Sequence, residues 1–109
     1  MRVGSIALIP FPFSDLSRSK LRPVLILTPP DQQGDFVALA ITSQGYHPGA
    51  VLLEAAGLQS GSLPSQSWIR TDKVFTLNRS LVTAEPAVVS PKHLQLALSG
   101  VCLHIGCAG

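Results

Sequence analysis

The chain has 109 residues, of which 46% are hydrophobic and 13% are charged, and its formal net charge is +2. This length suits one compact domain, residues 1–109, and is too short for two. So small a net charge does not by itself indicate nucleic-acid binding, and two cysteines are too few for a disulfide framework. The sequence has no signal-type or membrane-length apolar run, so we expect a cytoplasmic protein with no membrane partner.

The low charge content leaves little polar surface for a small domain. Ordinary soluble domains have about 25% charged residues. Either this domain is simply hydrophobic, or a second subunit covers part of its surface. We favour the second explanation and expect a homodimer.

Six segments predict β-strands. The first, "VGSIALI", is expected to end at Pro10 and Pro12, because proline cannot donate to a strand ladder. "PPDQQG" has turn composition and separates the second strand from the third. The Gly/Ser-rich stretch 56–66 is expected to be a loop, and the strand after it to break near Thr71. The predicted strands are 3–9, 22–28, 35–42, 50–54, 67–77 and 86–90.

One helix is predicted at the C-terminal end. Ser90 can cap its first turn, and Pro91 suits the first helical position. Gly100 weakens the helix and leaves its end uncertain. Short strands followed by one helix predict a mainly β fold, a small bent antiparallel sheet or partly closed barrel. The residues expected to form the apolar face of the helix are Leu94, Leu98 and Val101.

The turn between the second and third strands predicts how they pair. Placing Leu25 opposite Leu39 gathers the bulky side chains on one face of the sheet. The same register places Arg22 opposite Thr42 at the sheet's edge. A guanidinium and a hydroxyl are therefore predicted to be neighbours.

The fifth strand carries a second polar pair. A period of two places Trp68, Arg70 and Asp72 on one face. This pattern also fits a structural ion pair beside a half-buried indole, worth about 0–1 kcal/mol when exposed. From the residues alone we favour that structural role over catalysis.

Positive charge gathers between the first two strands, at Arg18, Lys20 and Arg22. These cations could contact phosphates, and an aromatic such as Phe13 could stack on a base. An ordinary solvated loop explains the same residues equally well.

Several blocks occur in a fixed order: "PFPFSDLSRSKLRPVLIL", then "ITS", then "SWIRTDK", and finally "PKHLQLAL". Together they resemble the MazF/PemK (Kid) toxins of type II toxin–antitoxin systems, over residues 3–100. The resemblance implies a small homodimeric, SH3-like barrel of the CcdB/Kid/MazF kind. It also implies a metal-independent endoribonuclease that cleaves single-stranded RNA at short sequences. A cognate antitoxin would silence it by laying a disordered acidic tail in the RNA groove.

The resemblance also implies roles for particular residues. Arg22 would hold the phosphate oxygens and Thr42 would donate a hydrogen bond, while the RNA's own 2′-hydroxyl attacks. Asp72 would accept the proton, and Arg70 would stabilise the leaving group or hold Asp72. The general acid is left unassigned. The implied RNA contacts are Phe13, Ser14, Arg18, Ser19, Lys20, Ser43 and Gln44.

The chain also departs from the family pattern. Gly4-Ser5 stands where the family usually has Gly-Asp, and residues 10–21 lack the histidine of the Kid branch. A second function therefore stays open: a non-catalytic module that only binds antitoxin, or that inhibits a protein such as gyrase, as CcdB toxins do. The soft ligands of the tail do not form a closed zinc site, so no metal or cofactor is expected.

Overall fold

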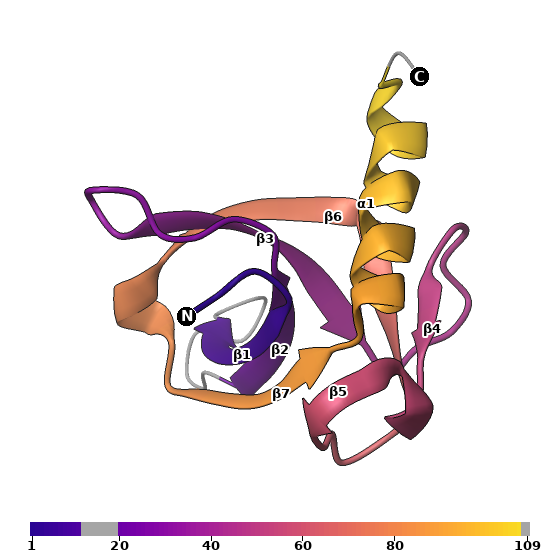
Figure 1. The fold of residues 1–109 in the computed structure, drawn as a ribbon, viewed down its shortest axis with the longest axis horizontal. Coiled ribbons are helices and arrows are strands. Elements are labelled where there is room, and N and C mark those ends of the chain that lie inside the picture. The colour runs from indigo at the N-terminus through magenta and orange to yellow at the C-terminus, as the bar shows by residue number, and fades with distance from the viewer. Residues whose placement is uncertain (12–19, 108–109) are drawn as a thin grey trace.

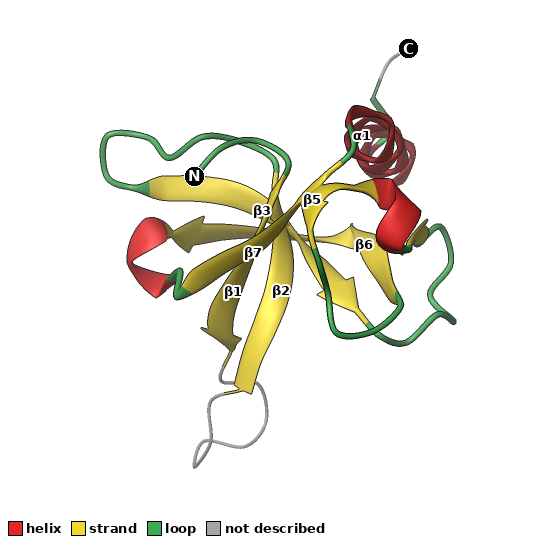
Figure 2. Cartoon of the chain, turned by 60° about the horizontal axis from the view of Figure 1, so that its bottom comes forward, coloured by secondary structure: helices red, strands yellow, loops and turns green. Residues whose placement is uncertain are grey.

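The computed structural model describes residues 1–11 and 20–107. Within them, seven antiparallel strands form one bent sheet that nearly closes into a barrel, and an α-helix rises from it (Figures 1 and 2). The predicted fold class is confirmed. The elements are β1 (Ser5–Phe11), β2 (Lys20–Ile26), β3 (Asp35–Thr42), β4 (Val51–Leu53), η1 (Ala55–Gly57), β5 (Leu58–Gly61), β6 (Ser67–Asn78), η2 (Arg79–Leu81), β7 (Ala84–Val89) and α1 (Pro91–Ile105).

The strands lie across the sheet in the order β4-β6-β3-β2-β1-β7-β5. The central strands bury both faces: Ile6 of β1 belongs to one core cluster, and its neighbour Ala7 belongs to the other. Strands buried on both faces are continuously apolar in sequence, as these are. This burial accounts for part of the low charge content without a second subunit.

The predicted register of β2 and β3 is confirmed, since Leu25 pairs with Leu39. The ladder stops before Arg22 and Thr42, so these two are not paired in the sheet as predicted. Pro23, at the point of separation, has no N–H to donate. The two strands part here, and the space between them becomes the site described below.

The prediction that β1 ends at Pro10 is wrong. The strand runs to Phe11, and Pro10 pairs with Leu21 of β2. On the other side of β1, pairing with β7 extends only as far as Leu8. Pro10 therefore has a neighbouring strand on one side only, which is where a sheet tolerates proline.

The prediction that 56–66 is entirely loop is also wrong, because the end of η1 and the whole of β5 lie within it. β5 pairs with β7, and a Cβ on Gly61 would lie 2.0 Å from the Pro86 carbonyl oxygen. Gly61 also has φ +80°, so both the close contact and the backbone conformation require glycine here. The short, mostly exposed strand shows no clear apolar alternation, and its pattern could not reveal it.

β6 is a continuous strand with an irregularity where a break was predicted. Its pairing with β3 slips between Leu39, which faces Val74, and Ile41, which faces Ile69. Residues 70–73 therefore stand opposite Ala40 alone. Such a bulge bends a strand and redirects its side chains.

The capping prediction for α1 is confirmed. The Ser90 hydroxyl accepts a hydrogen bond from the His93 backbone N–H at 3.2 Å. The helix continues to Ile105 and ends at Gly106, which adopts the left-handed conformation with φ +72°. No helix in 1–11 or 20–107 combines the length and the apolar character that crossing a bilayer takes.

The predicted apolar face of α1 is partly wrong. Leu94 and Val101 pack on the core, but Ala97 is the fully buried residue between them. Leu98 is 37% exposed. Gly100 does not end the helix; it lets α1 approach β6, since a Cβ there would lie 2.5 Å from Cγ2 of Thr71.

Candidate functional site

A cavity of about 330 Å³ opens where β2 and β3 part, and we call it the rim cavity. β2 contributes Lys20 and Arg22, and the end of β3 contributes Thr42 and Ser43. An apolar hollow with a few convergent polar groups is the usual form of a binding site. The apolar wall includes Leu8, Leu21, Pro23, Ile41, Leu63 and Pro86.

The basic side of the rim cavity comes from the start of β2. Arg22 is exposed and pairs through its backbone with Ile9 of β1. Phe11 pairs with Lys20, so the chain leaves β1 and enters β2 at this same edge. Four of the predicted RNA contacts, Phe13, Ser14, Arg18 and Ser19, lie outside the described residues.

The hydroxyl side comes from the turn after β3. Oγ1 of Thr42 accepts a hydrogen bond from the Gln44 backbone N–H at 3.0 Å, which fixes the turn. The hydroxyl hydrogen can still be donated to a ligand, because a hydroxyl both donates and accepts. Ser43 lines the rim cavity, whereas Gln44 is exposed beside it and does not.

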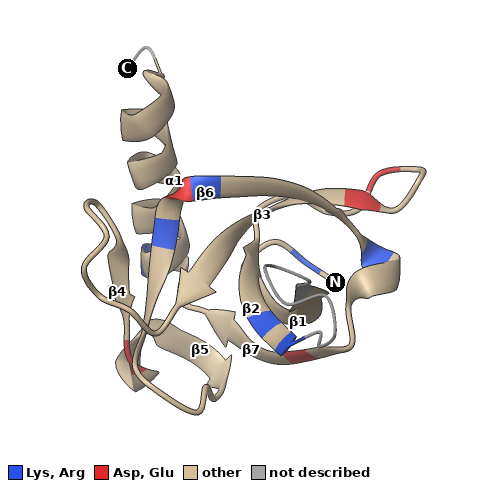
Figure 3. Cartoon of the chain, turned by 180° about the vertical axis from the view of Figure 1, so that it is seen from behind, with Lys and Arg blue, Asp and Glu red and all other residues tan. Residues whose placement is uncertain are grey.

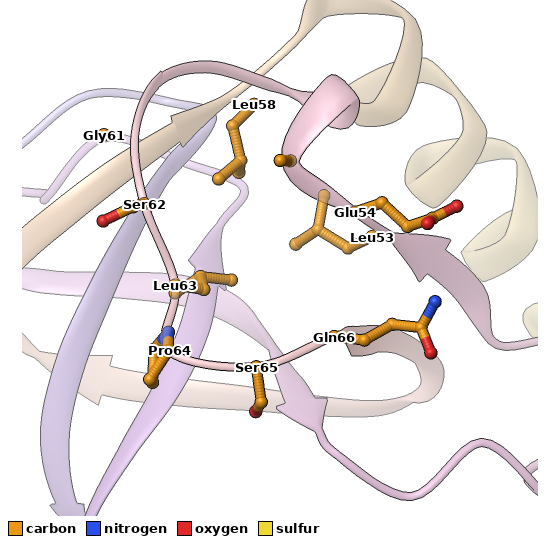
Figure 4. A pocket seen from close by; sticks show the side chains of 10 residues that line it. Leu53, Glu54, Leu58, Gly61, Ser62, Leu63, Pro64, Ser65 and Gln66 are labelled. Carbon is orange, nitrogen blue, oxygen red and sulfur yellow. The ribbon is translucent and has the colours of Figure 1, made fainter.

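A second cavity, of about 320 Å³, is also lined by the segment after β5. Figure 4 shows the residues that line it. Leu63, Pro64 and Ser65 line both cavities, so the segment is a wall common to the two. Glu54 brings a carboxylate to the second cavity. Of the two, only the rim cavity combines cations with hydroxyls.

Arg70 and Asp72 form a bidentate ion pair along β6. Nε of Arg70 donates to Oδ1 of Asp72 at 3.0 Å, and Nη2 donates to Oδ2 at 2.7 Å. Neither residue lines the rim cavity. Figure 3 marks lysine and arginine positions in blue on β2 and on β6, at separate places in the barrel. The four predicted catalytic residues therefore fall into two pairs.

The ion pair changes the chemistry of Asp72. The hydrogen bonds from Arg70 lower the pKa of the Asp72 carboxyl, partial burial opposes this, and the positive charges of Arg70 and His104 lower it further. A carboxylate with a lowered pKa is ionised at neutral pH but is a weaker base.

Three elements meet beside the ion pair. The Thr71 hydroxyl, buried in β6, donates to the Gly49 carbonyl oxygen at 3.1 Å. α1 brings His104 to the same place, where its Nε2 lies 3.2 Å from the position of a Cβ on Gly49. The bulge of β6, the loop after β3 and the helix thus meet at Thr71, which stands between Arg70 and Asp72 in the chain.

A metal centre has no counterpart in the part of the chain that the structure describes. No three His, Cys, Asp or Glu side chains gather there closely enough to hold an ion. His104 faces Gly49, while Cys102 and Cys107 line a different cavity along α1.

Comparison with known proteins decides the family. A family model described as "PemK-like, MazF-like toxin of type II toxin-antitoxin system" matches residues 2–105. The chain belongs to this family. No curated protein is similar enough in sequence to be matched to this MazF-like chain.

Solved structures of MazF proteins share the fold. A MazE-MazF complex from Deinococcus radiodurans superposes with a TM-score of 0.81 at 21% identity, covering 99% of this chain and 97% of that one. An endoribonuclease in complex with its cognate antitoxin, from a Mycobacterial species, gives 0.77 at 16% identity, with 100% and 98% covered. Mycobacterium tuberculosis toxin MazF-mt6 gives 0.74 at 16%, with 96% and 99% covered. At such identities the likeness concerns the fold.

Sequence reasoning missed part of the site of this MazF-like protein. The wall at 63–65 lies in the stretch that we predicted to be a Gly/Ser-rich loop. Pro64, whose ring fixes φ, was the available signal of a defined backbone conformation there. Tyr46, 73% exposed just beyond Thr42, contacts His47 with ring centroids 4.4 Å apart and the rings tilted, and neither residue lines the rim cavity.

Proposed function

We propose that this MazF-like protein is an endoribonuclease toxin that cleaves single-stranded RNA without a metal ion, at sequences that it selects. The observation that carries the proposal is that Arg22 and Thr42, two residues matched to the family pattern, line one cavity. Messenger and other RNAs are cytoplasmic, and we propose that the protein acts there.

In this reaction the 2′-hydroxyl attacks the adjacent phosphate, and negative charge builds up on its non-bridging oxygens. Arg22 offers a planar fork of N–H donors that remains charged throughout. Thr42 offers an O–H donor from the opposite wall of the rim cavity. Fixed donors aimed at developing charge lower a barrier, and losing one typically slows a reaction by about 10²–10³-fold.

The ion pair on β6 supplies a candidate base. Asp72 is a poor base while Arg70 holds both its oxygens. A phosphate that binds the Arg70 guanidinium would replace Asp72 as its hydrogen-bond partner. The pKa of the released Asp72 carboxyl would then rise. In this proposal the RNA strand reaches from the rim cavity to β6, so that its binding activates Asp72, and Arg70 passes to the phosphate or the leaving group.

RNA contacts extend along the edge of the site. Lys20 and Ser43 line the rim cavity. The predicted contacts that remain part of the proposal are Phe13, Ser14, Arg18, Ser19 and Gln44. The rim cavity is cationic at β2, which suits a phosphate backbone.

We further propose a cognate antitoxin that covers the rim cavity. One structurally similar protein is an endoribonuclease in complex with its cognate antitoxin, and another is MazF in a MazE-MazF complex. A disordered acidic tail could place carboxylates where phosphates bind and fold as it does so.

We also propose a homodimer. α1 leaves large apolar side chains exposed on its outer face, which would be costly in an isolated chain. Light scattering coupled to gel filtration tests this directly. The exposed residues are Leu96, Leu98, Leu103 and Ile105.

The proposed activity is tested with purified protein, single-stranded RNA of mixed sequence, and excess EDTA. Cleavage should continue and leave 2′,3′-cyclic phosphate and 5′-hydroxyl ends. Arg22→Ala should abolish it, whereas Arg79→Ala, an exposed arginine of η2 away from the rim cavity, should not. Cleavage that needs a metal, or full activity of Arg22→Ala, would contradict the proposal.

One observation favours the second candidate, a non-catalytic binding module. Asp72 is held by Arg70 with good geometry on both oxygens, as a purely structural pair would be. If so, the protein would bind antitoxin or a protein target and leave RNA intact. The same RNA assay separates the two functions.

A further inference from the structure

The last turn of α1 brings two thiols together. Gly106, with φ +72° and ψ +41°, reverses the chain, and the Cys107 backbone N–H then donates to the Cys102 carbonyl oxygen at 2.9 Å. This hydrogen bond and the left-handed glycine are the signature of a Schellman cap. In such a cap the residues at these two positions face each other across the helix end, and here both are cysteine.

The side chains are close as well as the backbone. Cys102 and Cys107 line one shallow cavity along α1, and both are exposed and free. The pKa of the Cys102 thiol is raised, first by a hydrogen bond with the Cys107 side chain. Neither sulfur is committed to the core.

We propose that Cys102 and Cys107 are a redox-modification site that forms a reversible disulfide across the C-terminal cap of α1. The oxidant is a low-molecular-weight disulfide of the glutathione class. One protein thiolate attacks its S–S bond, forms a mixed disulfide and releases one small thiol. The second protein thiolate then attacks the protein sulfur and releases the other small thiol. Two protein thiols are oxidised, and two electrons and two protons pass to the small disulfide.

The bond would act on the most exposed apolar part of the helix. Leu103 is 86% exposed and Ile105 is 68% exposed, and both lie inside the loop that the disulfide closes. Closing it would fix the last helical turn, which ends at the left-handed Gly106. The pair would thereby make the end of α1 responsive to thiol oxidation, in a compartment where stable disulfides are rare.

The test uses the full chain, reduced and then equilibrated with glutathione buffers of graded ratio. Free thiols are alkylated, and the intact mass is measured. We expect a monomer that has lost two hydrogen atoms and takes up no alkyl group. Cys102→Ser and Cys107→Ser should each form only a mixed disulfide with glutathione, under the same conditions.

Two cap variants make the test specific to the geometry. A Cβ on Gly106 meets nothing within 4 Å, so Gly106→Ala strains the backbone without a clash. In Gly106→Ala the thiol–disulfide equilibrium should shift several-fold toward the reduced form, as read from the midpoint of the glutathione titration. Gly106→Asn, which tolerates the left-handed conformation, should shift that midpoint less. Circular dichroism would verify that both variants keep the helix. Interchain or mixed disulfides as the only products of the parent protein, or an unchanged midpoint in Gly106→Ala, would overturn the proposal.

Discussion

Gly100 of α1 faces Thr71 of β6 so closely that a side chain has no room between them. A Cβ on Gly100 would lie 2.5 Å from Cγ2 and 2.9 Å from Cβ of Thr71. Thr71 stands between Arg70 and Asp72, so this contact fixes the helix against the strand that carries the ion pair.

We expect Gly100→Ala to destabilise the protein. In a free helix the change would stabilise by about 1 kcal/mol, but here the clash should cost about 2–3 kcal/mol and leave a net loss of about 1–2 kcal/mol. Urea unfolding of the variant measures it, with Ser99→Ala, an exposed helical neighbour, as the control. A Gly100→Ala protein more stable than the parent would show that α1 does not pack here as described.

The Arg70–Asp72 pair predicts a definite pH dependence. Because the folded-state pKa of Asp72 is lowered, the pair stabilises the fold above the ordinary aspartate pKa of about 3.9. That contribution should be lost as pH falls through the lower folded-state value. For a partly exposed pair it should not exceed about 1 kcal/mol.

Carbon-detected NMR titration of the Asp72 carboxyl checks this prediction. Arg70→Gln should raise the Asp72 pKa, since the largest cause of its lowering is removed. Arg79→Gln, which does not contact the pair, should leave the titration where it was. An Asp72 pKa that is unchanged in Arg70→Gln would refute the electrostatic account.

The rim cavity predicts a salt dependence of RNA binding. Each phosphate contact to single-stranded RNA adds about 0.7 to the slope of log affinity against log salt. Lys20→Ala and Arg22→Ala should each lower that slope by about this amount, measured by fluorescence anisotropy. Lys92→Ala on α1, away from the rim cavity, serves as control. An unchanged slope in both rim variants would mean that RNA binds elsewhere.

The sequence could predict the parts of the fold that follow from local patterns. Alternation and turn composition gave the pairing of Leu25 with Leu39, and cap chemistry gave the start of α1 at Ser90. These features depend on neighbours a few residues apart in the chain. The same register also indicated that Arg22 and Thr42 share one edge, although the cavity between them needed the structure.

Other features depend on distant partners and could not be predicted. Pro10 stays in β1 because β7 stops short of it, and β5 exists because β7 offers an edge to pair with. Leu98 is exposed because Ala97, a smaller residue, fits closest to the sheet. In the sequence, Gly100 is only a residue that weakens a helix. Its role in close packing depends on Thr71 of β6, which is distant in the chain.

The central claim is that Arg22 and Thr42 hold the same phosphate. It is tested most directly by a double-mutant cycle in single-turnover RNA cleavage, with Arg22→Lys, Thr42→Val and the double variant. If both groups contact one phosphate, the effects on the cleavage rate should be non-additive, with a coupling of about 1 kcal/mol or more. Effects that add within about 0.5 kcal/mol would show two independent roles and contradict the account.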